Sequence, residues 1–310
     1  MRVAATSAAS FLEENIMAPH RAIVVGTDGS PSSLQAVAWA AQEAALRNCA
    51  LSIVTTTFVA GAYGVPIGMP ESFFDDEERN GKNRLAVAAE IAGRTVPGQS
   101  LDLHTTLCTG TPAGELLERA QSAAMVVVGS NRQGIIERGF LGSVSAAVAT
   151  HAPCPVAIIH DLPDSEVTRL EGPVVVGVDG SAHSEPAVSM AFVEAGLRQC
   201  ELVAVHAWSD VDLPVPHGEV DGVSGWKQIV TQETALLSES LAGRAEDFPD
   251  VKVRTMVVMD RPVRNLREQA DNARLLVVGS RGRGGFTSML LGSTSRALMH
   301  SVRCPLLVVR

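Results

Sequence analysis

The sequence predicts an α/β protein of two tandem domains, each a five-stranded parallel sheet covered by helices on both faces. Three observations carry this prediction. The chain contains one unit written twice, strand-like runs alternate with helical patterns in each copy, and the strand runs are almost continuously Val, Ile and Leu. Strands joined through helices are parallel, and strands without polar alternation are buried on both faces.

The internal repeat is visible in four pairs of motifs whose spacing between copies barely changes, which indicates duplication. The pairs are IVVGTDGS (23–30) and VVVGVDGS (174–181), MVVVGS (125–130) and LLVVGS (275–280), LGSVS (141–145) and LGSTS (291–295), APCPVAIIH (152–160) and VRCPLLVVR (302–310).

Each copy is expected to alternate strands with helices. Pro112 lies near the start of one helix, where its missing N–H costs nothing. In the first copy the expected strands are 22–25, 51–57, 101–108, 125–128 and 156–159, and the helices 32–47, 74–94, 112–123 and 142–150. In the second copy the expected strands are 174–178, 202–208, 252–258, 275–278 and 306–309.

The repeat sets the expected domain limits, with a polar, unpatterned linker between the copies. These limits are a tail over 1–19, domain one over 20–161, a linker over 162–172 and domain two over 173–310. The tail carries Glu13 and Glu14 where a signal peptide needs an apolar centre, so we expect a cytoplasmic protein, with Met17 as an alternative start.

The composition restricts the partners. The net charge of −9 and the pI near 5.4 argue against nucleic acid or an anionic membrane as the main partner. No apolar run approaches the roughly 18 residues of a membrane helix, so we expect a soluble protein. An anionic ligand would be held locally, by backbone amides and a few arginines.

The five cysteines are odd in number and show no CxxC spacing. We therefore expect small buried hydrophobes in a reducing compartment, and no metal or redox site.

The stretch 275–295 joins a buried strand, a glycine-rich turn and a helix start. Gly279 and Gly282 are expected to allow positive φ and close approach of a phosphate, and Gly292 with Ser293 begins a helix whose free N–H groups and hydroxyls favour an anion. The alternative is an ordinary glycine-rich turn.

Asp28 and Asp179 each follow the first strand of their copy. Such a carboxylate can accept from a ribose hydroxyl or an adenine amino group, or coordinate Mg²⁺ beside phosphates. It can also form an Asx-turn or helix N-cap, and both interpretations stay open.

Other motifs give little support to a catalytic function. The sequence has no GxxxxGK[ST], no GxGxxG after a first strand and no GxSxG elbow. His151 and His300 lie near helix C-termini, where they meet the helix dipole. The Gly- and Pro-rich segments 59–72 and 209–225 are either lids over a ligand or surface loops.

The order of these motifs resembles the universal stress proteins in their tandem-domain bacterial form. The resemblance rests on GVDGS after the first strand, G-x2-G-x9-G-S/T after the fourth, and a final CP-apolar strand, and it covers nearly the whole chain. It implies a flavodoxin-like (Rossmann-like) sheet in each copy and, in the ATP-binding branch, an ATP molecule with or without Mg²⁺.

Carried over by position, the resemblance implies an ATP site in the second copy made of phosphate contacts and of ribose and adenine contacts. These fall on Gly279, Gly282, Gly292, Ser293 and Thr294, and on Asp179 and the backbone of Ala207. Arg281 and Arg283 flank Gly282 and are the best basic partners for phosphate, with solvated loop charges as the alternative.

The first copy departs from the pattern because Arg132 occupies the second glycine position. An Arg side chain there can pair with phosphate or block the backbone from closing on a ligand. We expect altered but retained binding, because the other matching positions keep their residue types. These positions are Asp28, Gly129, Gly142 and Ser143, and Thr56 stands opposite Ala207.

The expected function is an ATP-dependent sensor or regulator in the stress response that acts on an unidentified protein partner, with no efficient catalysis because no general base or P-loop lysine is evident. A slow ATPase and a nucleotide-free scaffold are the alternatives. The two domains are expected to form an internal pseudo-dimer, and pairing into a homodimer stays open.

Overall fold

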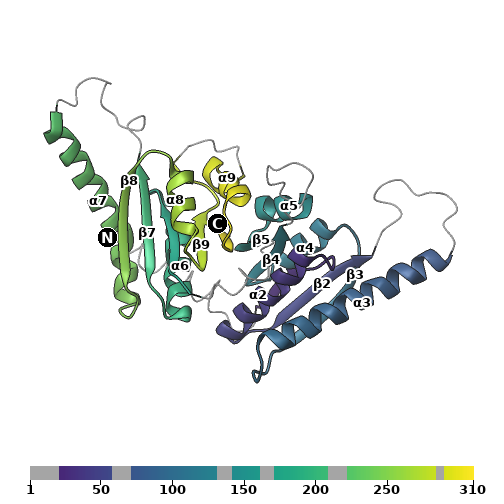
Figure 1. Ribbon diagram of the computed structural model, residues 1–310. Coiled ribbons are helices and arrows are strands. Elements are labelled where there is room, and N and C mark those ends of the chain that lie inside the picture. The colour runs from purple at the N-terminus through teal and green to yellow at the C-terminus, as the bar shows by residue number, and fades with distance from the viewer. Residues whose placement is uncertain (1–20, 58–70, 131–141, 161–170, 209–221, 284–289) are drawn as a thin grey trace. The chain divides into compact units, whose positions relative to one another are not determined.

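The computed structural model of the chain describes residues 21–57, 71–130, 142–160, 171–208, 222–283 and 290–310 (Figure 1). The chain divides into two compact units, Met1–Pro163 and Asp164–Arg310. Each unit is a parallel sheet with helices packed against it, so the predicted α/β fold class is confirmed.

The first unit has its strands in the order β3-β2-β1-β4-β5, and the neighbouring strands are parallel. Helix α2 packs with α3, and α4 packs with α5, which places one pair on each face when the crossovers are right-handed. The strands are β1 (Ile23–Gly26), β2 (Leu51–Thr57), β3 (Leu103–Thr109), β4 (Met125–Ser130) and β5 (Val156–His160). The helices are α2 (Pro31–Arg47), α3 (Glu71–Thr95), α4 (Pro112–Ala120) and α5 (Ser143–His151).

The second unit repeats this architecture with parallel strands in the order β8-β7-β6-β9-β10. Helix α6 packs with α7 and α8 packs with α9. The strands are β6 (Val174–Val178), β7 (Leu202–Trp208), β8 (Val253–Met259), β9 (Leu275–Gly279) and β10 (Leu306–Val309). The helices are α6 (Glu185–Arg198), α7 (Gly222–Asp247), α8 (Pro262–Ala270) and α9 (Ser293–Ser301).

The core of each unit lies around its central strands. Val25, Val127, Val175 and Leu276 are fully buried, and burying one such side chain stabilises a fold by about 1.5–3 kcal/mol. The third strands β3 and β8 each lie at one edge of the strand order of their unit, and their residues are mostly partly buried or exposed. The expected burial of every strand on both faces is therefore wrong for these two.

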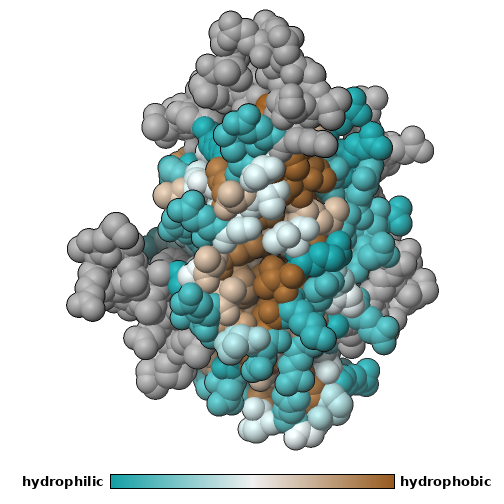
Figure 2. Space-filling view, turned by 90° about the vertical axis from the view of Figure 1, so that its left-hand side faces the viewer, coloured by the Kyte–Doolittle hydropathy of each residue, from teal (hydrophilic) through white to brown (hydrophobic). Residues whose placement is uncertain are grey.

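Figure 2 shows the side on which α7 and β8 lie in Figure 1, with hydrophobic residues gathered between hydrophilic ones. Val230 of α7 and Met259 of β8 are among the large apolar side chains that stay exposed. The edge of this sheet is therefore only partly covered. None of the helices in the described parts of the chain is long and apolar enough to cross a membrane.

The element limits differ from prediction by a few residues. The strand expected from residue 101 begins at Leu103, and the helix expected to reach residue 123 ends at Ala120, because a hydrogen-bonded turn follows it. Most of the segments 59–72 and 209–225, expected as lids or surface loops, lies outside the described residues.

The cysteines are buried to different degrees. Cys108, Cys154 and Cys304 are buried as expected, whereas Cys49 and Cys200 are partly exposed. The expectation of five buried thiols is therefore wrong for these two.

Candidate functional site

The topological switch point of the second unit lies between β6 and β9, and ligands of α/β sheets commonly bind outside the carboxyl ends of the strands at such a point. We call this region the crevice. The β6–β9 register ends at the pair Val176 and Val277, while the β6–β7 register continues to Val178 and His206. The strands β6 and β9 therefore part just before Asp179. The segment 279–283 at the end of β9, which we call the glycine loop, lies about a hundred positions from Asp179 in the sequence, and the sheet brings the two together.

Asp179 ties the glycine loop to the end of β6. Its Oδ1 accepts from the backbone N–H of Ser181 at 2.9 Å and from the Ser181 hydroxyl at 2.7 Å, and its Oδ2 accepts from the backbone N–H of Arg283 at 2.8 Å. Burial alone would raise the pKa of this carboxyl, but the bonds from Ser181 and Arg283 outweigh burial and hold the pKa below its usual value. The Asx-turn and a contact across the crevice therefore exist together.

Gly282 is required by space rather than by backbone conformation. A Cβ at this position would lie 2.4 Å from Oδ2 of Asp179, much closer than van der Waals contact. Neither Gly279 nor Gly282 has φ in the left-handed region, so the expectation of positive φ is wrong for both. Gly180, beside Asp179, has φ +73 instead.

Gly279 and Gly292 bring the loop and the helix start close together. A Cβ on Gly279 would meet the backbone oxygens of His183 and Arg281 at 2.9 and 3.0 Å. Gly292 is the N-cap of α9, and its N–H donates to the Ser280 carbonyl at 2.7 Å. The loop thus returns to the end of its own strand before the helix begins.

Helix α9 begins at the N-cap Gly292 with no side-chain cap, beside Ser280 and Arg281. Ser293 is exposed and Thr294 is partly buried, and the first N–H groups of such a helix, with its dipole, favour an anion. The third hydroxyl of this run has another role, because Ser295 donates to the Gly279 carbonyl at 2.6 Å. It holds the helix against β9 and is not directed at a ligand.

The remaining predicted residues of this site are Ala207 and Arg281. Ala207 is partly buried near the end of β7, the neighbour of β6, which ends one residue before Asp179. Arg281 is exposed in the glycine loop, where its side chain can reach an anion. The sequence reasoning missed Ser181, for which the GS following Asp179 was the available signal. It treated Arg283 as a basic partner for phosphate, whereas the structure shows its backbone N–H donating to Asp179.

The first unit has the same arrangement of elements around Asp28. Asp28 is exposed and accepts from the Ser30 backbone N–H at 2.9 Å; burial would raise its pKa, but this bond and the other Ser30 contacts lower it. Thr56 lies on β2, Gly129 on β4, and Gly142 caps α5, which begins at Ser143. Arg132 lies outside the described residues.

Gly129 shows that the first unit keeps the tight packing of this edge. A Cβ there would meet the backbone of Ser32 and Ser33 at 2.6–2.7 Å. Ser145 donates to the Gly129 carbonyl at 2.7 Å, as Ser295 does to Gly279. The strand-to-helix framework is therefore common to both units.

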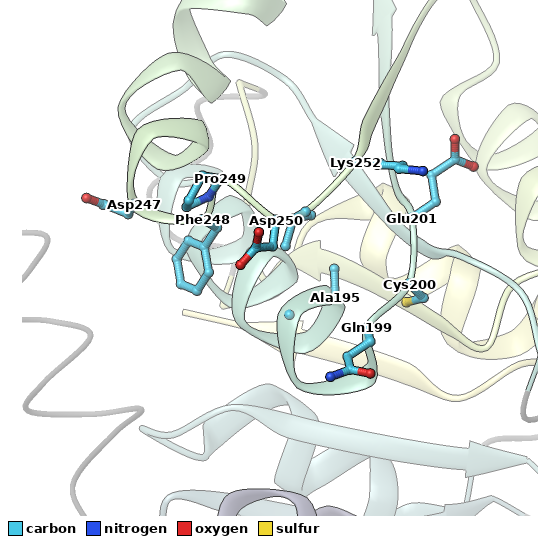
Figure 3. A pocket seen from close by; sticks show the side chains of 11 residues that line it. Ala195, Gln199, Cys200, Glu201, Asp247, Phe248, Pro249, Asp250 and Lys252 are labelled. Carbon is cyan, nitrogen blue, oxygen red and sulfur yellow. The ribbon is translucent and has the colours of Figure 1, made fainter.

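A pocket of about 680 Å³ lies at the amino ends of the strands of the second unit (Figure 3). It is lined by the end of α6, the start of β7 and the connection from α7 to β8, with Phe248 and Pro249 beside Asp247, Asp250 and Lys252. These charged side chains are exposed. This pocket lacks the convergent backbone donors found at Asp179.

No group of three or more His, Cys, Asp or Glu side chains in the described parts of the chain is arranged to hold a metal ion. At Asp179 three protein donors already surround the carboxylate. Because a carboxylate has about four acceptor positions, capacity for one further donor, such as a hydroxyl, remains.

Comparison with known proteins gives one family for both units. The model of the universal stress protein family matches residues 19–160 and 172–310. A universal stress protein of Mycobacterium tuberculosis is 42% identical over 294 residues, covering 93% of this chain and 96% of the relative. Another from Mycolicibacterium smegmatis is 39% identical over 300 residues, with the same shares covered.

Solved structures agree on the fold. A universal stress protein from Archaeoglobus fulgidus superposes with a TM-score of 0.70 at 19% identity, covering 93% of this chain and 98% of that one. A functionally unknown protein from Pseudomonas aeruginosa superposes with a TM-score of 0.59 at 15% identity, covering 95% and 94%.

Proposed function

The chain belongs to the universal stress protein family, and from this premise we propose that it is an ATP-binding regulator whose nucleotide site is the crevice between β6 and β9 of the second unit. The observation that carries the proposal is the joining of Asp179 to the glycine loop through Arg283, with Gly282 packed against the same carboxylate. This contact holds Arg283 at Asp179, and Arg281 of the same segment lies close to Gly292 at the uncapped start of α9.

The phosphates would lie between the loop and α9. The backbone of Gly279, Gly282 and Gly292 permits close approach, and the N–H groups of Ser293 and Thr294 supply donors with the favourable end of the helix dipole. Arg281 adds charge at the rim. No lysine is needed for such a cradle, because backbone amides alone can surround an anion.

The nucleoside would lie over the ends of β6 and β7. The remaining acceptor capacity of Asp179 suits a ribose hydroxyl, and the backbone of Ala207, near the end of β7, would contact the base. Mg²⁺ would accompany the triphosphate and be held mainly by phosphate oxygens and water, since three donors already occupy Asp179.

The first unit provides an internal comparison. Any side chain at the position of Gly282 meets the carboxylate after the first strand, and Arg132 stands at the matching position of the first copy. We propose that the second unit binds ATP more tightly and that Asp28 with Thr56, Gly142 and Ser143 forms the weaker site.

The proposed role is regulatory rather than catalytic. In the second site the carboxylate beside the glycine loop is Asp179, and its hydrogen bonds and lowered pKa make it a poor base for activating water. Nucleotide binding would instead change the surface offered to a protein partner. Single-turnover measurement of bound ATP separates this proposal from a slow ATPase.

The test starts from the full chain. Denaturing purified protein and analysing the released small molecules by absorbance and mass reveals any bound adenine nucleotide, and calorimetric titration with ATP gives the stoichiometry. We expect one tight site per chain and a second on Arg132→Gly. Absence of both released nucleotide and ATP-dependent thermal stabilisation would refute the proposal and favour a nucleotide-free scaffold.

A further inference from the structure

His206 is a buried histidine at the point where β6 leaves the sheet. It forms the last register pair of β6 and β7, opposite Val178. Its side chain is fully buried, with Nδ1 at 2.8 Å from the Val178 carbonyl oxygen and Nε2 at 2.7 Å from Oε2 of Glu233 on α7. One ring therefore connects two strands to the helix that covers them.

The two contacts of this ring are different in kind. A carbonyl oxygen can only accept, so Nδ1 donates to Val178. The contact between Nε2 and Glu233 then holds one proton, whichever of the two atoms carries it. The side chain of Glu233 is only 14% exposed, so the contact is largely shielded from water.

Through Val178, the His206 contact acts on the residue that binds the glycine loop, Asp179. Val178 directly precedes Asp179, and β6 has already parted from β9 after Val176. Within the sheet, Val178 is therefore paired with β7 and no longer with β9. A bond to the Val178 carbonyl fixes the point from which the Asp179 carboxylate reaches the glycine loop.

The first unit makes the corresponding contact to the strand-end carbonyl with a smaller side chain. Thr55 occupies the equivalent place on β2, and its hydroxyl donates to the Thr27 carbonyl at 2.6 Å, one residue before Asp28. Both units therefore satisfy the carbonyl before the aspartate with a side chain from the neighbouring strand. Only the histidine of the second unit extends the connection to a helix.

We propose that His206 and Glu233 are positioning residues for the ligand of the second unit. His206 fixes the strand end that carries Asp179, and Glu233 couples that strand end to α7, so that occupation of the crevice and the placement of α7 depend on each other. This inference rests on the proposed ATP site. It adds a residue pair and a helix through which nucleotide binding can alter the protein surface.

The test compares ATP affinity in variants that remove the two contacts separately. His206→Ala removes both contacts, and His206→Thr keeps the carbonyl bond in the form that Thr55 has in the first unit. Glu233→Gln removes the carboxylate while retaining its size. Glu239→Gln, at an exposed position of the same helix, is the matched control.

We expect ATP affinity of the second site, measured by calorimetry far below the melting temperature, to fall about tenfold or more in His206→Ala and to recover partly in His206→Thr. Glu233→Gln should weaken binding several-fold, and Glu239→Gln should leave it unchanged. Hydrogen exchange should show ATP protecting α7 in the wild type and protecting it less in Glu233→Gln.

The outcomes separate the two levels of the proposal. If the wild-type chain binds no ATP, the proposed function is refuted and the positioning role with it. If the wild type binds ATP and the folded His206→Ala and Glu233→Gln variants bind equally well, with lower melting temperatures alone, the pair is structural and the inference is overturned.

Discussion

Replacing Gly282 by alanine tests the geometry of the second site directly. The new Cβ would stand 2.4 Å from Oδ2 of Asp179, about 1 Å inside ordinary van der Waals contact. Either the carboxylate or the loop has to move by that amount. In both cases the 2.8 Å bond from the Arg283 N–H to Asp179 is lost.

The size of the effect follows from the lost bond. A hydrogen bond to a charged group contributes about 1.5–3 kcal/mol, which corresponds to a roughly ten- to hundredfold weaker ATP affinity if the closed loop is the binding form. Titration calorimetry with ATP measures this, and a thermal melt shows whether the variant is folded.

Gly243 on α7 serves as the control for the same substitution. A Cβ at Gly243 meets nothing within 4 Å, so Gly243→Ala should stabilise the fold by about 0.5–1 kcal/mol. Wild-type affinity in Gly282→Ala, or an equal loss in Gly243→Ala, would contradict the reasoning.

Three further predictions concern charge and burial. Because the pKa of Asp179 is lowered in the folded state, its contribution to stability is present above pH about 4 and is lost as the pH falls through the folded pKa. Asp179→Asn should therefore lower the free energy of unfolding at neutral pH by about 1–2 kcal/mol and make that free energy decline less in acid. Urea unfolding at several pH values measures both effects. An unchanged acid profile would speak against this assignment. Burial raises the pKa of the Cys304 thiol to about 12, whereas Cys49 and Cys200 are partly exposed. A thiol reagent should therefore label Cys49 and Cys200 first and Cys304 only on unfolding, which peptide mass mapping measures. Early labelling of Cys304 would contradict its burial. Arg198→Met removes an ion-pair partner of the fully buried Glu194 carboxylate, and Arg94→Met removes the partner of the exposed Glu90. Arg198→Met should lower the free energy of unfolding in chemical denaturation clearly more than Arg94→Met, which should cost under about 0.5 kcal/mol, and equal losses would be the contrary result.

The fold was predictable because two independent patterns agree. The apolar runs predict the strands, and the repeat predicts that both halves share one architecture. The edge strands β3 and β8 depart from the expected burial, since a run of apolar letters does not reveal that a strand has a neighbour on one side only.

The candidate site was predictable in composition but not in its contacts. The sequence indicated Asp179 and the glycine loop as ligand groups and attributed Gly282 to backbone freedom. The structure shows that the glycine leaves room for a carboxylate that arrives from another strand. The contact joins residues about a hundred positions apart, so no local pattern contains it.

The sequence by itself determined the duplication, the parallel α/β class, the family and the chemical types at the crevice, because these depend on periodicity and motif order along the chain. Only the tertiary structure showed that Asp179 accepts a hydrogen bond from the backbone N–H of Arg283 in the glycine loop. It also showed that His206 connects the end of β6 to Glu233. Both depend on which strands become neighbours and where they part, and strand adjacency is a property of the folded sheet.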